Sequence, residues 1–222
     1  MIISYPLLII LLSYLLGSIP FGYLLVRIFR GQDVRQTGSG NIGATNVART
    51  GSKGLAIATL LLDALKGYVA VAIAFRLNGA CCGPGPIGTM ADTNSALGAL
   101  EMAYVAAAVA AFCAIVGHMF PIWLRFRGGK GVATAVGAFV VIAPRAVLLV
   151  LLFFVIVVAI TRYVSLGSMA GAAVFPFAAW WLNRFTRTPG VMFLIVASSL
   201  LVIIRHQDNV RRLLAGTEHR WR

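Results

Sequence analysis

Residues Ile3 to Val26 read ISYPLLIILLSYLLGSIPFGYLLV, an apolar run that contains no charged residue. A helix needs about 20 mostly apolar residues to cross a bilayer, and this run supplies them. Arg27 and Arg30 follow at once, so a basic segment begins where the run ends. No positively charged segment precedes it, as one would in a secretory signal. We therefore expect a retained first membrane span whose N-terminus lies outside the cell.

The rest of the chain has the same character. Of its 222 residues 60% are hydrophobic and only 11% charged, with a mean hydropathy of +0.91. Soluble domains carry about 25% charged residues, so these values exclude that class. The length allows about six to eight spans plus short loops. We expect an all-α integral membrane protein, a single bundle of about seven transmembrane helices that takes up residues 1–222 as one domain.

Six further apolar runs follow the first one. They cover about Gly54–Phe75, Ala99–Val116, Val132–Ile142, Val147–Ile160, Ser168–Leu182 and Val191–Ile204. The segment Leu77–Gly98 is rich in Gly, Pro and Asn and has no Lys or Arg, so we expect an external loop there. The last three runs are short, and a re-entrant or interfacial helix could replace one of them.

Positive charge sets the orientation. With seven spans, 14 of the 19 Lys and Arg residues fall on one side, four fall on the other, and Lys66 lies inside a span. By the positive-inside rule the richer side is cytoplasmic, and it includes the C-terminus. The net charge of +13 would suggest nucleic acid in a soluble protein. Here the same rule and attraction to anionic membrane lipid account for it, so no nucleic-acid partner is expected.

Three polar motifs lie on that cytoplasmic side, and the first reads GSGNIGATNVAR from Gly38 to Arg49. Its small residues let the backbone approach a ligand, and its converging N–H groups form a nest for phosphate or carboxylate. Arg49 could clamp such an anion as a fork. The candidate binding residues are Gly38, Ser39, Gly40, Asn41, Gly43, Thr45, Asn46 and Arg49. The competing interpretation is a glycine-rich connector between two helices.

The second motif reads GHMFPIWLRFRGGKGVAT from Gly117 to Thr134. Gly128, Gly129, Lys130 and Gly131 stand just before an apolar helix, so free N–H groups and the positive helix end would meet an anion. The pattern resembles half of a nucleotide P-loop, but Val132 replaces the required Ser or Thr, so ATP is not expected. His118 is kept as a candidate binding residue, although a structural role as a hydrogen-bonding histidine is favoured.

The third motif reads RHQDNVRRLLAGTEHR from Arg205 to Arg220. His206, Asn209 and Arg212 follow one another at intervals of three residues, so on a helix they share one face. A solvated basic tail lying on anionic lipid is the alternative, which we prefer for Arg220 and Arg222.

Two charged residues, Asp63 and Lys66, interrupt the second apolar run. A charge at the bilayer centre costs on the order of 2.5 to 3.5 kcal/mol, so such residues face the protein interior. Being three apart they can pair, and we weigh a structural ion pair equally with a functional role. Cys81, Cys82 and Cys113 have no His or Cys at metal-ligand spacing, so no metal site is expected.

The three motifs together resemble those of the bacterial PlsY family over nearly the whole chain. The matching stretches are SGNIGATNVAR from Ser39, GHMFPIWLRFRGGKGVAT from Gly117 and HQDNVRRLLAGTE from His206. The resemblance implies an acyltransferase that moves a fatty acyl group from acyl phosphate to the 1-hydroxyl of glycerol 3-phosphate. It also implies functional roles for Ser39, Arg49, Lys130, His206 and Asn209.

The chemistry of these residues agrees with that expectation. Two phosphate-bearing substrates, one with a long acyl chain, need two anion cradles at the membrane surface beside an apolar groove. Acyl phosphate is already activated, so no covalent nucleophile and no cofactor is required. His206 or a substrate phosphate could accept the hydroxyl proton. The enzyme that makes acyl phosphate is a further candidate partner.

Two other classes remain open. A transporter of an organic phosphate would explain many spans and intramembrane charges. Its polar residues should, however, meet near mid-bilayer, and the sequence has no internal repeat. A structural membrane subunit would leave the three anion-binding patterns unexplained.

Overall fold

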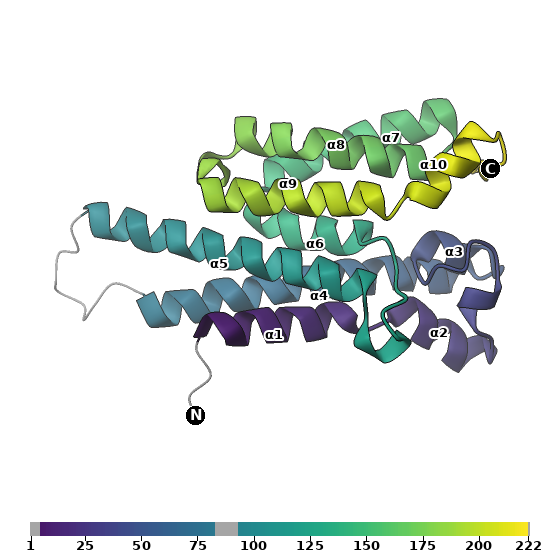
Figure 1. Ribbon diagram of the computed structural model, residues 1–222, viewed down its shortest axis with the longest axis horizontal. Coiled ribbons are helices and arrows are strands. Elements are labelled where there is room, and N and C mark those ends of the chain that lie inside the picture. The colour runs from purple at the N-terminus through teal and green to yellow at the C-terminus, as the bar shows by residue number, and fades with distance from the viewer. Residues whose placement is uncertain (1–4, 83–92, 222) are drawn as a thin grey trace.

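The computed structural model describes residues 5–82 and 93–221, without the side chains of 79–82 and 93–96 (Figure 1). Within those ranges the regular structure is helical and contains no β-strand, which confirms the all-α expectation there. The α-helices are α1 Tyr5–Ser18, α2 Phe21–Arg30, α3 Ala44–Ala48, α4 Lys53–Cys82, α5 Thr93–Met119, α6 Val132–Ile142, α7 Pro144–Thr161, α8 Val164–Leu182, α9 Pro189–Ile204 and α10 Gln207–Leu214. Short 3₁₀ turns form at η1 Val34–Gln36, η2 Ile122–Leu124 and η3 Arg184–Arg187.

All seven apolar runs form helices, but not all are long enough to cross a bilayer. Among the described residues five helical segments reach a spanning length, and a sixth does if α9 and α10, bent by 47° to each other, count as one. With 11 residues, α6 is only about 16 Å long, against a hydrocarbon core of about 30 Å. The expectation of about seven spans is therefore confirmed only in part, because α6 and the 16-residue α9 are short.

Two helix boundaries differ from the expected ones. The first apolar run breaks into α1 and α2 at Pro20, because proline has no N–H to donate and restricts the residue before it. The expected loop Leu77–Gly98 is helical at both ends, since α4 continues to Cys82 and α5 begins at Thr93. Backbone hydrogen bonds continue past the apolar segment because the residues there tolerate a helix. Residues 83–92 of that loop lie outside the described part of the chain.

Two helix pairs pack with their backbones almost in contact, α1 with α5 and α4 with α6. At each crossing both helices offer a glycine. A Cβ atom on Gly17 would lie 2.1 Å from the Ala114 carbonyl oxygen, and one on Gly117 would lie 2.3 Å from that of Tyr14. In the second pair, Gly137 and Gly67 meet the backbone of the facing helix in the same way. Small residues of this kind allow helices to associate in lipid, where burial of apolar surface supplies no drive.

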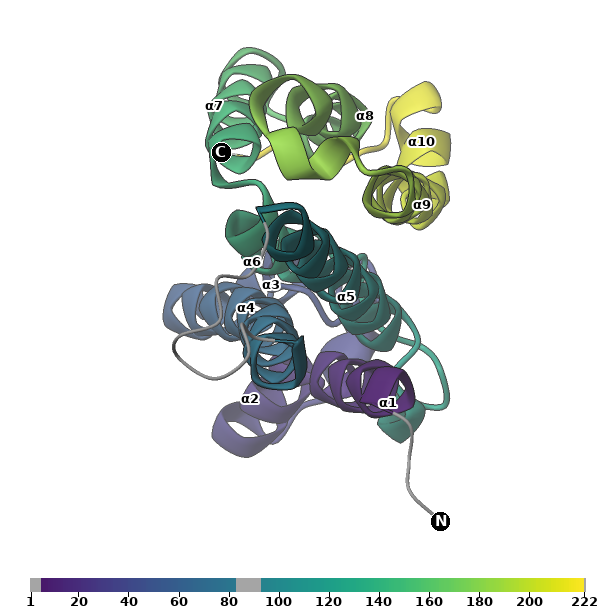
Figure 2. The same cartoon turned by 90° about the vertical axis from the view of Figure 1, so that its left-hand side faces the viewer.

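The helices form two groups. In Figure 2, α7, α8 and α9 lie apart from the group of α1, α2, α4, α5 and α6. The contact between α6 and α7 joins the groups. The contact between α5 and α9 also joins the groups. Along the length of the molecule, α2, α3 and α10 lie at the same end (Figure 1). The three polar motifs therefore share one end of the bundle, as their common side in the sequence predicts.

The close packing of α4 on α6 makes a direct prediction. In Gly137→Ala the added methyl would lie 1.8 Å from the Ala64 carbonyl oxygen, so the helices must separate. We expect a loss of about 1–3 kcal/mol in the free energy of unfolding, seen as a lower thermal midpoint in detergent. Gly54→Ala is the control, since no atom lies within 4 Å of the Cβ position of Gly54. Equal midpoints for the two variants would contradict this packing.

Candidate functional site

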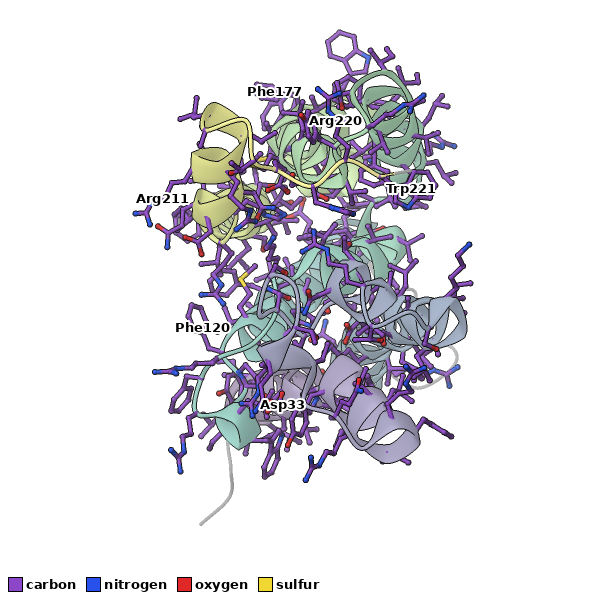
Figure 3. The ribbon with its side chains drawn as sticks, turned by 90° about the vertical axis from the view of Figure 1, so that its right-hand side faces the viewer. Asp33, Phe120, Phe177, Arg211, Arg220 and Trp221 are labelled. Carbon is purple, nitrogen blue, oxygen red and sulfur yellow. The ribbon has the colours of Figure 1, made fainter. Side chains whose placement is uncertain are left out.

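Contacts between the second and third motifs form a polar cluster at the end of the bundle that Figure 3 views directly. The Lys130 ammonium donates a hydrogen bond to Oδ1 of Asn209, which joins the second motif to the third. Arg205 supports the junction, with Nη2 at 3.4 Å from the carbonyl oxygens of Gly128 and Gly129. The positive charge of Arg49, in the first motif, also acts on Lys130. Candidate residues far apart in sequence thus gather here.

Glu218 is the centre of the hydrogen bonds in this cluster. Its Oε1 accepts from Ser165 Oγ at 2.8 Å and from Asn209 Nδ2 at 2.7 Å, and its Oε2 accepts from Arg212 Nε at 2.7 Å. The side chain is buried, with 4% of its surface exposed. Because Nδ2 of Asn209 faces Glu218, its Oδ1 faces Lys130. The carboxylate therefore sets the orientation of the Asn209 amide.

The tail reaches this position by folding back over the turn between α7 and α8. The Trp221 N–H donates to the Arg162 carbonyl at 2.8 Å, and Arg220 Nε donates to the Tyr163 hydroxyl at 3.0 Å. In Figure 3, Arg220 and Trp221 lie over this group of helices, whereas Arg211 points away from it. Arg220 is exposed, in keeping with a solvated basic tail, and its guanidinium also holds the tail on Tyr163.

The charges in the cluster influence one another. Burial alone would raise the pKa of Glu218, but the hydrogen bonds from Ser165, Arg212 and Asn209 outweigh it and lower that pKa. Burial, followed by the positive charges of Arg212 and Arg49, lowers the pKa of Lys130 to about 8. Lys130 is thus a cation at neutral pH whose charge is held in an unfavourable environment. An anion placed beside it would relieve that disadvantage.

His206 lies at the junction of α9 and α10 and is buried. Its Nδ1 lies 2.7 Å from the Val202 carbonyl oxygen, which can only accept, so Nδ1 carries the proton. Burial lowers the pKa of His206 to about 4. The ring is therefore neutral near pH 7 and keeps Nε2 as a hydrogen-bond acceptor.

The first motif forms a compact loop tied together by Asn46. Nδ2 of this buried residue donates to the carbonyl oxygens of Val34, Thr37 and Asn41, and its Oδ1 accepts from the Ser39 N–H at 2.8 Å. All its hydrogen-bonding capacity is used inside the loop. Asn46 therefore shapes the loop and cannot bind an anion as the sequence pattern suggested. Asn41 has a similar local task, because its Oδ1 accepts from the Gly43 N–H at 3.0 Å.

Other residues of this loop stay open to a ligand. Gly38 and Gly40 have φ values of +57° and +69°, a backbone region that favours glycine. The Arg49 side chain crosses Gly38, where a Cβ would lie 2.8 Å from Arg49 Cδ. Arg49 Nε is buried without a hydrogen-bond partner among the described residues. Ser39 and Thr45 are exposed. An unpaired buried guanidinium N–H is costly, and an anion would satisfy it.

The backbone N–H groups of the glycines in the second motif make different contacts from the expected ones. The N–H groups of Gly128 and Gly129 donate to the carbonyls of Met119 and His118, so they cap α5 and are not free. Gly131, with φ +80°, begins α6, whose first-turn N–H groups have no partner within the helix. Of the anion-binding groups expected in this half P-loop, only the Lys130 side chain and the positive N-terminal end of α6 remain available. His118 lies behind the loop, where a Cβ on Gly129 would be 1.9 Å from its Nε2.

An apolar slot adjoins the polar cluster. It lies between α6, α7, α8 and α9. Its lining includes Val132, two residues after Lys130, and Val202, whose carbonyl binds His206. Phe139 and Phe175 also line it, with ring centroids 4.8 Å apart. The side chains that line the slot are almost all apolar, which suits a hydrocarbon chain.

Sequence reasoning missed three residues of the cluster, which are Ser165, Arg205 and Glu218. Glu218 offered a signal, since it is one of only two acidic residues, with Asp208, in a tail that carries Arg205, Arg211, Arg212, Arg220 and Arg222. Ser165 offered none, because only the fold brings it to the tail. The placement of Asn209 and Arg212 on one face was predicted from their spacing.

Comparisons with known proteins show which family this chain resembles. A family model described as glycerol-3-phosphate acyltransferase matches residues 7–216. A protein of that name from Rhodopseudomonas palustris (strain BisB5) is 43% identical over 211 residues, which cover 95% of this chain and 93% of that protein. One from Agrobacterium fabrum (strain C58) is 44% identical over 210 residues, covering 95% of this chain and 89% of that protein.

Two solved structures are also similar. One is a crystal structure of PlsY, an integral membrane glycerol 3-phosphate acyltransferase, in its glycerol 3-phosphate form. It has a TM-score of 0.82 and 31% identity, covering 99% of this chain and 96% of that one. The lysophosphatidic acid form of PlsY has a TM-score of 0.78 and 30% identity, covering 98% and 95%.

The lowered pKa of Lys130 predicts how anion binding depends on pH. Sulfate stays doubly charged from pH 7 to 9.5, whereas Lys130 is charged below a pKa of about 8 and neutral above it. We expect sulfate affinity to fall about tenfold or more over this range at constant ionic strength, measured by calorimetry. His206 is already neutral at pH 7 and does not contribute. In Lys130→Arg, which keeps its charge, the fall should disappear. An unchanged fall in that variant would contradict the assignment.

Proposed function

Since the chain belongs to the glycerol-3-phosphate acyltransferase family, we propose that it moves a fatty acyl group from acyl phosphate to the 1-hydroxyl of sn-glycerol 3-phosphate. The products are lysophosphatidate and inorganic phosphate. The observation that carries this proposal is the cluster of Lys130, Asn209, Arg212 and Glu218 beside an apolar slot. Such a site suits substrates that join phosphate to a long hydrocarbon chain.

Two cradles bind the two phosphates in this proposal. The first consists of Arg49, with its unpaired buried Nε, and the open loop around Ser39. The second consists of Lys130, the N-terminus of α6 and the outer side of Arg212. The positive charge of Arg49 contributes to the lowered pKa of Lys130, and in this proposal the two phosphates are neighbours. Their combined positive charge stabilises the negative charge that grows on the departing phosphate.

The reaction needs no covalent acyl-enzyme. The 1-hydroxyl oxygen attacks the acyl carbonyl carbon and forms the ester, while the bond from that carbon to the phosphate oxygen breaks. The hydroxyl proton passes to a substrate phosphate and leaves with inorganic phosphate. His206, with a pKa near 4, is a weak base at neutral pH. Its Nε2 and the Asn209 amide orient glycerol 3-phosphate, and the acyl chain occupies the slot between α6 and α9.

The proposed setting is the bacterial inner membrane. The chain is a multi-pass membrane protein, and the motif end carries most of its positive charge, which supports a cytoplasmic active site. Glycerol 3-phosphate would arrive from the cytoplasm. Acyl phosphate would arrive from the enzyme that makes it, a possible direct partner. A transporter of organic phosphate is less well supported, since the polar cluster lies at one end of the bundle and not at mid-membrane.

The first test is the donor requirement and the role of Lys130. Purified protein should release phosphate from palmitoyl phosphate only when glycerol 3-phosphate is present, and should not use palmitoyl-CoA. Lys130→Ala should lower kcat/KM by about 10²–10³-fold, because the variant loses a charge aimed at the departing phosphate. Arg211→Gln is the matched control, since it removes an exposed positive charge of the third motif. We expect it to stay within about twofold of the parent. Turnover of the thioester would contradict the proposed donor.

The slot predicts a second effect, on acyl-chain length. Ala172 lines the slot and Ala173, on the same helix, is exposed on the outer face. Ala172→Leu should lower kcat/KM for palmitoyl phosphate about tenfold, because the side chain fills the space for the chain. Activity with a short-chain acyl phosphate and the KM for glycerol 3-phosphate should not change. Ala173→Leu adds the same bulk outside the slot and should behave as the parent. Equal losses with both chain lengths would place the acyl chain elsewhere.

A further inference from the structure

Three ionisable side chains meet inside the membrane-spanning part of the bundle, on α4 and α5. Lys66 Nζ lies 2.7 Å from Asp63 Oδ1, and His118 Nδ1 lies 3.5 Å from the same oxygen. All three side chains are at least 96% buried. Neither Asp63 nor Lys66 belongs to the polar cluster of the proposed site. Charged side chains at this depth in a membrane are energetically costly, so their presence indicates a function.

Lys66 holds the break between α1 and α2. Its Nζ donates a hydrogen bond to the Ile19 carbonyl at 2.8 Å, and Ile19 is the residue before Pro20. That proline ends α1 and has no N–H of its own, so a helical partner for nearby carbonyls is lost. α2 then packs against the first motif, where a Cβ on Gly22 would lie 1.9 Å from the Ile42 carbonyl oxygen. Lys66 therefore determines how the chain enters the first motif.

His118 supports the second motif from behind. Its ring lies against Gly129, where a Cβ would be 1.9 Å from Nε2, and its carbonyl accepts the Gly129 N–H at 3.0 Å. Gly129 is the residue before Lys130. Asp63 Oδ1 lies 3.5 Å from Nδ1 of the ring without a hydrogen bond, so the imidazole packs between the carboxylate and the loop. A displaced ring would displace the loop that carries Lys130.

We propose that Asp63, Lys66 and His118 form a positioning triad that aligns the first and second motifs with each other. Asp63 joins the two arms, because one of its oxygens faces both Lys66 and His118. The triad touches neither phosphate cradle and acts through Lys130, an assignment that rests on the proposed acyltransferase function. An apolar set of equal volume could fill this space without loss of stability. An apolar set could not make the directional contacts that fix the chain break at Ile19 and hold the His118 ring against Gly129.

The test combines kinetics with hydrogen exchange. Asp63→Asn keeps the size of the side chain and removes its charge, and Asp63→Asn with Lys66→Gln leaves no charge of the pair in the membrane. We expect both to lower kcat/KM for glycerol 3-phosphate by about 100-fold, the loss that a misplacement of 1 Å can cause. Thr59→Val is the matched control, because the buried Thr59 hydroxyl, one turn before Asp63, donates only to Leu55 in its own helix. It should behave as the parent.

A double-mutant cycle separates positioning from general destabilisation. If Asp63 acts through Lys130, the losses in kcat/KM caused by Asp63→Asn and by Lys130→Arg will overlap. The double variant will then be only slightly less active than the less active of the two single variants. Additive losses would overturn the proposal, as would an Asp63→Asn variant with unchanged kcat and KM.

Hydrogen exchange tests the triad without turnover, so a failure of the proposed function would not hide its result. Amides of residues 128–131 should exchange faster in Asp63→Asn and in the double variant than in the parent or in Thr59→Val. Exchange in α7 and α8, which lie in the other group of helices, should not change. Unaltered exchange at 128–131, or faster exchange throughout the protein, would overturn the positioning role.

Discussion

The buried carboxylate of Glu218 holds the functional end of the molecule together. Lys130, Arg49, Arg205 and Arg212 bring four positive charges to a small region, and without an anion they would repel one another. Glu218 supplies the opposite charge from a tail that has to fold back to deliver it. Ser165 and Asn209 complete its hydrogen bonds, so that the charge can be buried at all. The site is thus neutralised in part, and it keeps an excess of positive charge for a ligand.

The helix pairs that carry this end are built from backbone contact. α1 with α5 and α4 with α6 approach so closely at their glycines that neither pair can slide without losing its contact. All four of these helices begin or end next to a motif or to the break that leads into one. Packing far from the polar cluster therefore sets the distances between its loops. The Asp63, Lys66 and His118 group lies in the same region. Its polar contacts orient the helices that the glycine contacts bring close together.

Hydrophobic periodicity and the distribution of charge predicted much of this structure. The features that they did not predict depend on contacts between residues that are distant in the sequence. The helical class, the common side of the motifs and the shared face of Asn209 and Arg212 follow from spacing and from the count of basic residues. The roles of Asn46, Gly128 and Gly129 could not be read in that way. Amides and glycines bind phosphate or the backbone with equal ease, and only the folded loop shows which carbonyls are within reach. Ser165 illustrates the same limit, since its partner Glu218 lies 53 residues away.

The short α6 has a consequence for the lipid around the protein. A helix of about 16 Å covers roughly half of the hydrocarbon thickness, and Figure 1 shows it lying within the length of its neighbours α4 and α5. No residue of α6 is exposed, so lipid meets the longer helices around it and not α6 itself. The loop of the second motif fills the depth that α6 leaves open, which keeps Lys130 among protein groups, beside Asn209 of the third motif.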